Sequence, residues 1–174
     1  MKKIITDHLY LRQLSIKDVS PKYIHALNDG EVVQFTGARY IKWNKGKILQ
    51  YIRKSNSNGR SLLIGIFLKK VKKHIGNIRL FNFGRNHKRV ELGIMIFDKF
   101  EWGNGYGTES LKAIVNYIFE ELKLHRICAD YYSVNKPSAR IFEKAGFKIE
   151  GVFKDHFLLN GKYVDSIRVA KING

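Results

Sequence analysis

Three glycines at alternate positions, Gly103, Gly105 and Gly107, stand directly before a segment with helical periodicity. Glycine adopts positive φ easily and, without a Cβ, lets backbone N–H groups come close to a ligand. At the start of a helix these N–H groups have no intrahelical partner and lie at the positive end of the helix dipole. The loop is therefore a candidate cradle for an anion, and the natural anion is a pyrophosphate. The alternative is an ordinary glycine-rich turn between a strand and a helix.

Two common phosphate-binding motifs do not fit this loop. The pattern GxxxxGK[ST] of nucleoside triphosphatases is absent from the chain. The dinucleotide pattern GxGxxG also fails, because its third glycine would fall at Thr108 or at Ser110. The loop must therefore hold another kind of diphosphate, if it holds one at all.

Length and composition predict a single compact domain covering residues 1–174. A hydrophobic share of 44% with only two prolines is typical of a globular chain rather than a disordered one. The longest apolar run, residues 61–68, is too short for a membrane span. Cys128 is the one cysteine, which rules out an internal disulfide, and nothing around it resembles a metal cluster. We expect a cytoplasmic protein that uses no metal.

The charge is strongly positive, since 32 Lys and Arg stand against 15 Asp and Glu, a formal net charge of +17. Such a field favours polyanions, among them nucleic acid, the ribosome and phosphorylated cofactors. Charge that serves solubility alone is the alternative. No RNA-recognition motif and no arginine-rich tract accompany it.

Periodicity predicts an α/β fold with a mixed sheet. Alternating or apolar strand patterns occupy residues 8–14, 60–70, 74–83, 88–97 and 126–133, and two more strands flank the hairpin signal Asn160-Gly161. Helical patterns occupy residues 15–29, 45–56, 105–123 and 135–146. Strands in a meander followed by β-α-β-α-β-β imply helices on both faces of the sheet.

Three segments together resemble one known family. ELGIMIFDKFEWGNGYGTESL, residues 91–111, is similar to the acetyl-CoA loop of the GNAT N-acetyltransferases, whose signature is Q/R-x-x-G-x-G/A. Gly105 and Gly107 match its small positions, and Trp102 stands where Gln or Arg is usual. NKPSARIFEKAGF (135–147) resembles the family's N-x-x-A-x-x-x-Y-x-K-x-GF segment. The tail, residues 150–172, resembles that of RimJ/RimL-type ribosomal-protein acetyltransferases and of bacterial spermidine acetyltransferases.

The resemblance implies a mostly antiparallel sheet of about six or seven strands and a binding site for acetyl-CoA. Backbone amides of residues 103–108 would grip the pyrophosphate, so a side chain at Gly105 or Gly107 would occupy the phosphate path. The preceding strand would splay from its neighbour and expose backbone groups to the pantetheine arm and the oxyanion. The residues implied in binding are Ile94, Met95, Ile96, Trp102, Gly103, Asn104, Gly105, Tyr106, Gly107, Thr108, Asn135 and Phe142.

Acetyl transfer also needs a base for the amine and an acid for the thiolate. Glu91 lies on the strand that leads to the loop, among apolar residues that would make its carboxylate a better base; a structural strand acid is the alternative. Phe142 stands where many relatives have a tyrosine acid, so Ser138 is the acid that the resemblance offers, or water serves instead. A first-turn serine bonded locally is the alternative for Ser138. Asn135 would contact pantetheine, cap the helix, or do both.

The acceptor amine remains open at this point. A ribosomal-protein N-terminus, an amino sugar or another small amine fits a basic protein better than a polycationic polyamine does. Candidate pocket aromatics are Phe35, Tyr40, Trp43, Tyr131 and Tyr132, which fit a core role as well. A homodimer is left open. No membrane partner is expected, and nucleic acid only through the ribosome. The rival interpretation is a non-catalytic CoA- or RNA-binding module of the same fold.

Overall fold

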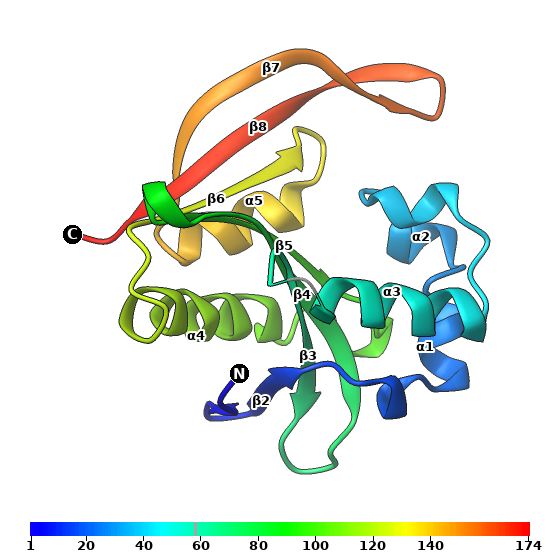
Figure 1. Cartoon of the computed structure of the whole chain (residues 1–174). Coiled ribbons are helices and arrows are strands. Elements are labelled where there is room, and N and C mark those ends of the chain that lie inside the picture. The colour runs from blue at the N-terminus through cyan, green and yellow to red at the C-terminus, as the bar shows by residue number, and fades with distance from the viewer. Residues whose placement is uncertain (58) are drawn as a thin grey trace.

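The computed structural model describes residues 1–57 and 59–174, which form one sheet and the helices around it (Figure 1). The described strands are β1 (Ile4–Ile5), β2 (Leu9–Gln13), β3 (Leu62–Leu68), β4 (His74–Gly84), β5 (Arg89–Ile96), β6 (Arg126–Tyr132), β7 (Lys148–Leu159) and β8 (Lys162–Ile172). The α-helices are α1 (Pro21–Ala26), α2 (Gly30–Val33), α3 (Lys45–Ser57), α4 (Tyr106–Glu120) and α5 (Lys136–Lys144). Short 3-10 turns are η1 (Ile16–Asp18), η2 (Gly37–Tyr40), η3 (Arg85–His87) and η4 (Lys99–Glu101). None of the helices in these ranges is long and apolar enough to cross a membrane.

The sheet is mixed and mostly antiparallel, as predicted. Its order is β1-β2-β3-β4-β5-β6-β8-β7, and β5 with β6 is the parallel pair among the described strands. Eight strands are described, one more than the six or seven expected. The additional strand is β1, whose two residues are too few to produce an alternating pattern.

Local signals explain where several elements begin and end. Ser20 caps α1 by accepting a hydrogen bond from the Tyr23 N–H at 3.2 Å, with Pro21 in the first turn. Helix α5 ends before Gly146, whose φ of +80° is the left-handed value that a glycine often adopts directly after a helix. Asn160 and Gly161, with φ of +50° and +79°, form the tight turn between β7 and β8.

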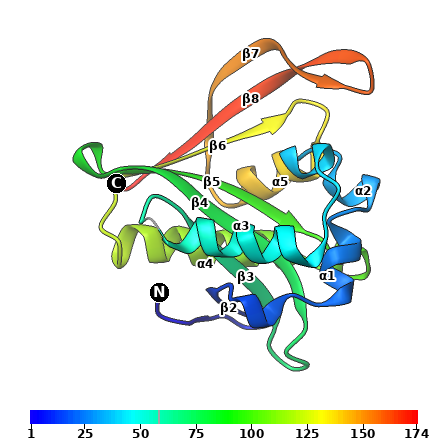
Figure 2. The same cartoon turned by 45° about the vertical axis from the view of Figure 1, so that its right-hand side comes forward.

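Helices cover both faces of the sheet, and each face has its own core (Figure 2). On one face α4 and α5 pack with residues such as Ile114 and Phe142. On the other face α1, α2 and α3 pack with residues such as Tyr23 and Ile52. The hairpin of β7 and β8 arches away from the helices at the far edge of the sheet (Figure 1). Strand β5 lies in the middle, between the two cores.

Candidate active site

The centre of the sheet contains a split between β5 and β6. The two strands pair in parallel at Arg89–Arg126, Val90–Ile127 and Glu91–Cys128, and the pairing stops there. Strand β5 nevertheless runs on to Ile96, and β6 to Tyr132. The part of β5 that contains Ile94, Met95 and Ile96 pairs with β4 on one side, and on the other side none of the described strands pairs with it. The splay that the resemblance implied is therefore present, and it leaves backbone groups facing the gap.

The glycine loop connects this free end of β5 to the start of α4. Gly103 and Gly105 have φ of +82° and +81°, a conformation that side-chain-bearing residues rarely adopt. The first helical hydrogen bond runs from the Glu109 N–H to the Gly105 oxygen at 3.0 Å. Nothing in the described chain accepts a hydrogen bond from the N–H groups of residues 106–108, and no side chain caps the helix. The loop thus offers three unpaired amides at the positive end of a 15-residue helix.

Trp102 ties the glycine loop to the splayed strand. Its indole Nε1–H donates to the carbonyl oxygen of Ile96 at 2.7 Å. The carbonyl is thereby satisfied, and the loop cannot swing away from the end of β5 without losing that bond. Asn104, by contrast, makes only a long contact of 3.4 Å with Glu101 and points into the exposed part of the loop.

The space beside Gly107 differs from the one predicted for a side chain there. A Cβ on Gly107 would lie 2.7 Å from Cδ1 of Ile141, on α5. A side chain there would therefore meet the neighbouring helix and not the phosphate path. For Gly103 and Gly105 the space is open, since no atom lies within 4 Å of an added Cβ. Gly105 alone of the two signature glycines fits the prediction of an open path.

Helix α5 brings Asn135 and Ser138 to the other strand of the split. Asn135 is the N-cap, and its Oδ1 accepts a hydrogen bond from the Ser138 N–H at 3.2 Å. The amide Nδ2 of Asn135 has no protein acceptor among the described residues, so it can still donate to a ligand. The hydroxyl of Ser138 makes no hydrogen bond with a described residue either. The local hydrogen bond considered as an alternative role for that hydroxyl is therefore not seen.

Phe142 lies in the core. Its side chain is 3% exposed, and its ring packs against Tyr131 at 5.9 Å and against Phe147 at 5.1 Å between ring centroids. This burial favours a packing role beneath the site over contact with a ligand. It also explains how the chain accommodates a phenylalanine at this position, since the ring fills an aromatic cluster that needs no hydroxyl.

Glu91 occupies the last paired position of β5, where the two strands part. Its carboxylate lies 3.3 Å from the guanidinium of Arg168, which also contacts Asp130 at 2.5 Å. The apolar environment predicted for Glu91 is therefore wrong, because Arg168 comes from β8, far along the sequence. Glu91 lies where the two strands part and is held there by the guanidinium of Arg168.

The aromatic residues predicted for an acceptor pocket separate into two groups. Tyr132, at the end of β6, stacks on Phe157 of β7 with 3.9 Å between ring centroids and contacts Phe35 at 5.5 Å. Tyr131 is in the core beside Phe142, and Trp43 packs against Tyr51 and donates its indole N–H to the Ala38 oxygen. The first group lies at the split and the second supports the fold.

Arg39 joins this aromatic group to the hairpin. Its guanidinium donates to the Gln34 and Leu158 carbonyl oxygens, both at 2.6 Å, and lies over the ring of Tyr132. Tyr40, beside it, is 72% exposed. The turn η2, which contains Arg39, is thus fastened to the β7–β8 hairpin, and together they form one wall of the split. No pattern in the sequence predicts a role for Arg39.

A buried carboxylate behind the glycine loop was also not predicted. Asp98 is 2% exposed, and its Oδ2 accepts from Lys22 at 2.6 Å and from Lys73 at 2.8 Å. Its Oδ1 is buried without a partner among the described atoms. Burial alone would raise the pKa of Asp98, but the two lysines outweigh it and hold the pKa below its ordinary value. Asp98 fastens the turn that leads into the loop to α1 and to the β3–β4 turn.

Glu109 fastens the opposite side of the loop. In the first turn of α4, its Oε1 accepts from the Thr6 hydroxyl at 2.6 Å and from the His8 N–H at 2.9 Å. Partial burial would raise the pKa of Glu109, but these hydrogen bonds prevail and lower it. The start of α4 is therefore fixed to the N-terminal strands. An acid in a first helical turn is a common signal, but its partner cannot be predicted from it.

The comparisons with known proteins agree with this geometry. Residues 8–148 match the model of the acetyltransferase (GNAT) domain family. The uncharacterized N-acetyltransferase YoaA of Bacillus subtilis is 31% identical over 92% of this chain and 91% of its own length. The ribosomal protein uS5-alanine N-acetyltransferase of Escherichia coli is 31% identical over 70% of this chain and 63% of its own. The structure of spermidine N-acetyltransferase from Vibrio cholerae, with CoA and spermine, aligns with a TM-score of 0.84 at 20% identity, covering 96% of both chains.

A split parallel pair followed by a glycine loop and a helix N-terminus defines an acyltransferase of this fold. The chain belongs to the GNAT family of acetyltransferases. The resemblance seen in residues 91–111 and 135–147 is thereby confirmed, including the likeness to the ribosomal-protein and spermidine enzymes. Its relatives are N-acetyltransferases, and so is this protein.

Proposed function

We propose that the protein transfers an acetyl group from acetyl-CoA to the terminal amine of a polypeptide. One observation supports acetyl-CoA as the acetyl donor. Pairing between β5 and β6 ends at Glu91, and β5 then leads to a loop with three unpaired amides. The free edge of β5 can pair with a ligand chain that contains amides, and the start of α4 supplies N–H groups for a diphosphate. A ligand with both parts in this order is coenzyme A.

The residues present fit that ligand. The N–H groups of residues 106–108 would hold the diphosphate, with Gly105 leaving the approach open. The free edge of β5 at Ile94 and Ile96 would bind the pantetheine arm as an added strand would. The amide of Asn135 would donate from the other side of the split. Acetyl-CoA would supply the thioester, and a backbone N–H of β5 would stabilise the negative charge that develops on its carbonyl oxygen.

The transfer itself requires few further groups. The amine nitrogen attacks the thioester carbon, a C–N bond forms, and the C–S bond breaks to release a thiolate. Glu91 accepts the proton that the amine loses, directly or through water, and Arg168 holds the carboxylate in place. The Ser138 hydroxyl, which has no protein partner in the described chain, delivers a proton to the sulfur and takes one back from water. A thiolate is a good leaving group, so this last contribution is modest.

The acceptor side favours a peptide over a polyamine. Arg168 contacts both Glu91 and Asp130, so the two carboxylates nearest the split are already paired with a cation. A polycation would have to displace that guanidinium. The wall formed by Tyr132, Phe157 and Phe35 offers instead ring faces, which suit an extended peptide with one terminal amine. These substrates and acetyl-CoA fit the cytoplasmic location that the sequence predicts.

Two measurements test the proposal. Titration calorimetry with CoA should give saturable heat on folded protein. Release of free thiol should then be followed with acetyl-CoA and four acceptors: a peptide with a free N-terminus, the same peptide N-terminally blocked, glucosamine and spermidine. We expect turnover with the free peptide and none with the blocked one. Absence of CoA binding would overturn the donor assignment. Faster turnover with glucosamine or spermidine than with the free peptide would overturn the acceptor assignment.

A further inference from the structure

One face of the sheet has an open position next to Glu91. Gly93 is exposed although β5 lies in the middle of the sheet, and no described atom lies within 4 Å of a Cβ added to it. Met95, two positions later, packs with the core on the side of α1, α2 and α3. Side chains alternate along a strand, so Glu91, Gly93 and Met95 share that face. The space over Gly93 therefore lies beside the proposed base of the reaction.

Arg79 of β4 borders this open space. It pairs directly with Gly93 in the antiparallel register, and residues paired in this way face the same side with Cα atoms about 5 Å apart. Arg79 is exposed. Its guanidinium lies over the rings of Phe81, on β4, and Tyr51, on α3, at 5.3 and 5.6 Å from their centroids. The two rings hold the guanidinium in place at the edge of the open space.

In the part of the chain that the structure describes, no carboxylate pairs with Arg79. By contrast, Arg12, Arg126 and Arg168 each form an ion pair with a carboxylate. The sequence around Arg79 cannot supply one, because residues 32–90 contain 15 Lys and Arg and no Asp or Glu. A guanidinium fixed between rings presents its N–H groups in the planar fork that suits a carboxylate or a phosphate. Arg79 is therefore available to an anion that comes from outside the protein.

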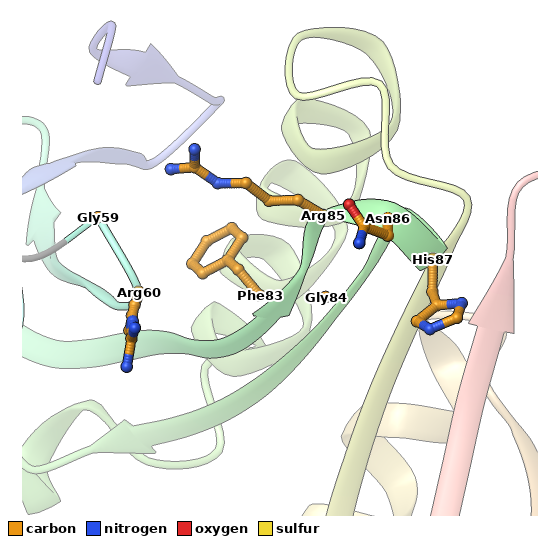
Figure 3. Close-up of a pocket in the computed structure, with 7 residues that line it drawn as sticks. All are labelled: Gly59, Arg60, Phe83, Gly84, Arg85, Asn86 and His87. Atoms are coloured by element: carbon orange, nitrogen blue, oxygen red, sulfur yellow. The ribbon is translucent and has the colours of Figure 1, made fainter.

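The hollow at the turn from β4 to β5 is a different place. Its volume is about 490 Å³, and Arg85 is among the residues that line it (Figure 3). The pairing of β4 with β5 shifts register between Phe81 and Gly84, so the residues beyond this irregularity do not continue the alternation of the strand before it. Arg79 lies before the irregularity and keeps its place opposite Gly93.

We propose that Arg79 binds an anionic group of the acceptor, and that the preferred acceptors are peptides with an acidic residue at the second or third position. The inference rests on the proposed function, in which the terminal amine meets Glu91. Two residues along β5 and one step across to β4 put the Cα atoms of Glu91 and Arg79 roughly 8 Å apart. An extended peptide advances about 3.3–3.6 Å per residue, so an acidic side chain at either position can span this separation.

The test is thiol release at saturating acetyl-CoA with three peptides that begin with alanine. They differ only at the second and third positions, which are both glutamate, both glutamine or both lysine. The variant Arg79→Met keeps an unbranched stem against the two rings and removes the charge. Its matched control, Arg53→Met, removes a charge from an exposed position of α3 in the same acid-free segment. Thermal unfolding of both variants should match that of the wild type.

We expect the wild-type protein to have a kcat/KM at least about tenfold higher for the glutamate peptide than for the glutamine peptide, because a charge-assisted contact is gained. In Arg79→Met this ratio should fall below about three, whereas in Arg53→Met it should stay within about threefold of the wild-type ratio. Equal values for the two peptides in the wild type would overturn the proposal, and that comparison needs no variant. An equal fall of the ratio in both variants would overturn it as well.

Failure of the proposed function gives a different result. If CoA binds but no peptide is acetylated, the peptide assignment is wrong, and glucosamine with glucosamine 6-phosphate then tests Arg79 separately. These two amines differ only by a phosphate. Faster turnover of the phosphorylated amine, lost in Arg79→Met and kept in Arg53→Met, would support an anion site at Arg79 for a small acceptor. Equal turnover of the two would overturn the inference for that class too.

Discussion

Gly107 of α4 and Ile141 of α5 meet so closely that an added Cβ would lie 2.7 Å from the Cδ1 of the isoleucine. The two helices that flank the split are held together at this point. A side chain at Gly107 would therefore disturb helix packing, whereas Gly105, two positions earlier, has open space where a side chain would lie.

The contact predicts a stability effect at Gly107 that grows with side-chain size. Ile141 can turn its terminal methyl aside for one added methyl group. Gly107→Ala should therefore lower the free energy of unfolding by less than about 1 kcal/mol. Gly107→Val should cost about 1–3 kcal/mol in the free energy of unfolding, because it overpacks the contact. Urea denaturation measures both, and Gly107→Val/Ile141→Ala should recover part of the loss. A valine variant as stable as the wild type would contradict this account.

At Gly105 we expect the reverse, a loss of ligand affinity without a loss of stability. Asparagine tolerates the φ of +81°, and its side chain would occupy the open approach to the amides. Gly105→Asn should weaken CoA binding at least tenfold by calorimetry. Gly161→Asn is the matched control, because Gly161 has a φ of +79° and open space at a distant turn. Equal affinity in the two variants would argue against the amides as the diphosphate site.

Asn135 combines two roles that one pair of substitutions separates. Asp caps a helix as well as Asn does but has no amide N–H to donate. Asn135→Asp should therefore keep the melting temperature and raise the KM for acetyl-CoA several-fold. Asn135→Ala should do this and also lose about 1 kcal/mol of stability. If Asn135→Asp has the wild-type KM, the side chain serves only the helix.

Ser138 should affect turnover and not binding if its hydroxyl protonates the thiolate. Because CoA thiolate leaves easily, we expect Ser138→Ala to lower kcat about tenfold, less than general acids often contribute, with little change in KM. Ser138→Thr retains a hydroxyl and should restore part of the rate. Steady-state kinetics by thiol release decides the matter. A wild-type kcat in Ser138→Ala would assign the proton to water.

The lysines around Asp98 predict a pH dependence of stability. A carboxyl with a lowered pKa stabilises the fold above its unfolded value, about 3.9, and that contribution is lost as pH falls through the lower folded value. At pH 7 the substitution Asp98→Asn should lower the free energy of unfolding by about 1–3 kcal/mol. The gap between wild type and variant should narrow in acid melts below about pH 4. Glu120→Gln, at an exposed acid, should show no such convergence.

The parts of the fold set by neighbouring residues were predictable from sequence. Ser20 with Pro21, Gly146 and Asn160-Gly161 each act within a few positions of the chain, and the structure has the cap or turn that each predicts. The glycine loop also lies between strand and helix as expected. Sequence patterns suffice where the interaction partners are close along the chain.

The remaining features depend on residues far apart. Lys22 reaches Asp98 across 76 positions, and Arg168 reaches Glu91 across 77. No pattern of period two or 3.6 encodes such pairs, so Asp98 was missed and the environment of Glu91 was predicted wrongly. The contact between Gly107 and Ile141 was not predicted for the same reason, since the sequence does not show where an added Cβ would point.

The end of β5–β6 pairing at Glu91 and Cys128 has a consequence for how such enzymes diverge. In the proposed site the donor contacts mainly main-chain atoms, so mutation can change most side chains of this region without removing those contacts. The wall made by Arg39, Tyr132 and the β7–β8 hairpin consists of side chains and is open to selection. One half of the pocket can stay constant through evolution while the other is rebuilt for each new amine.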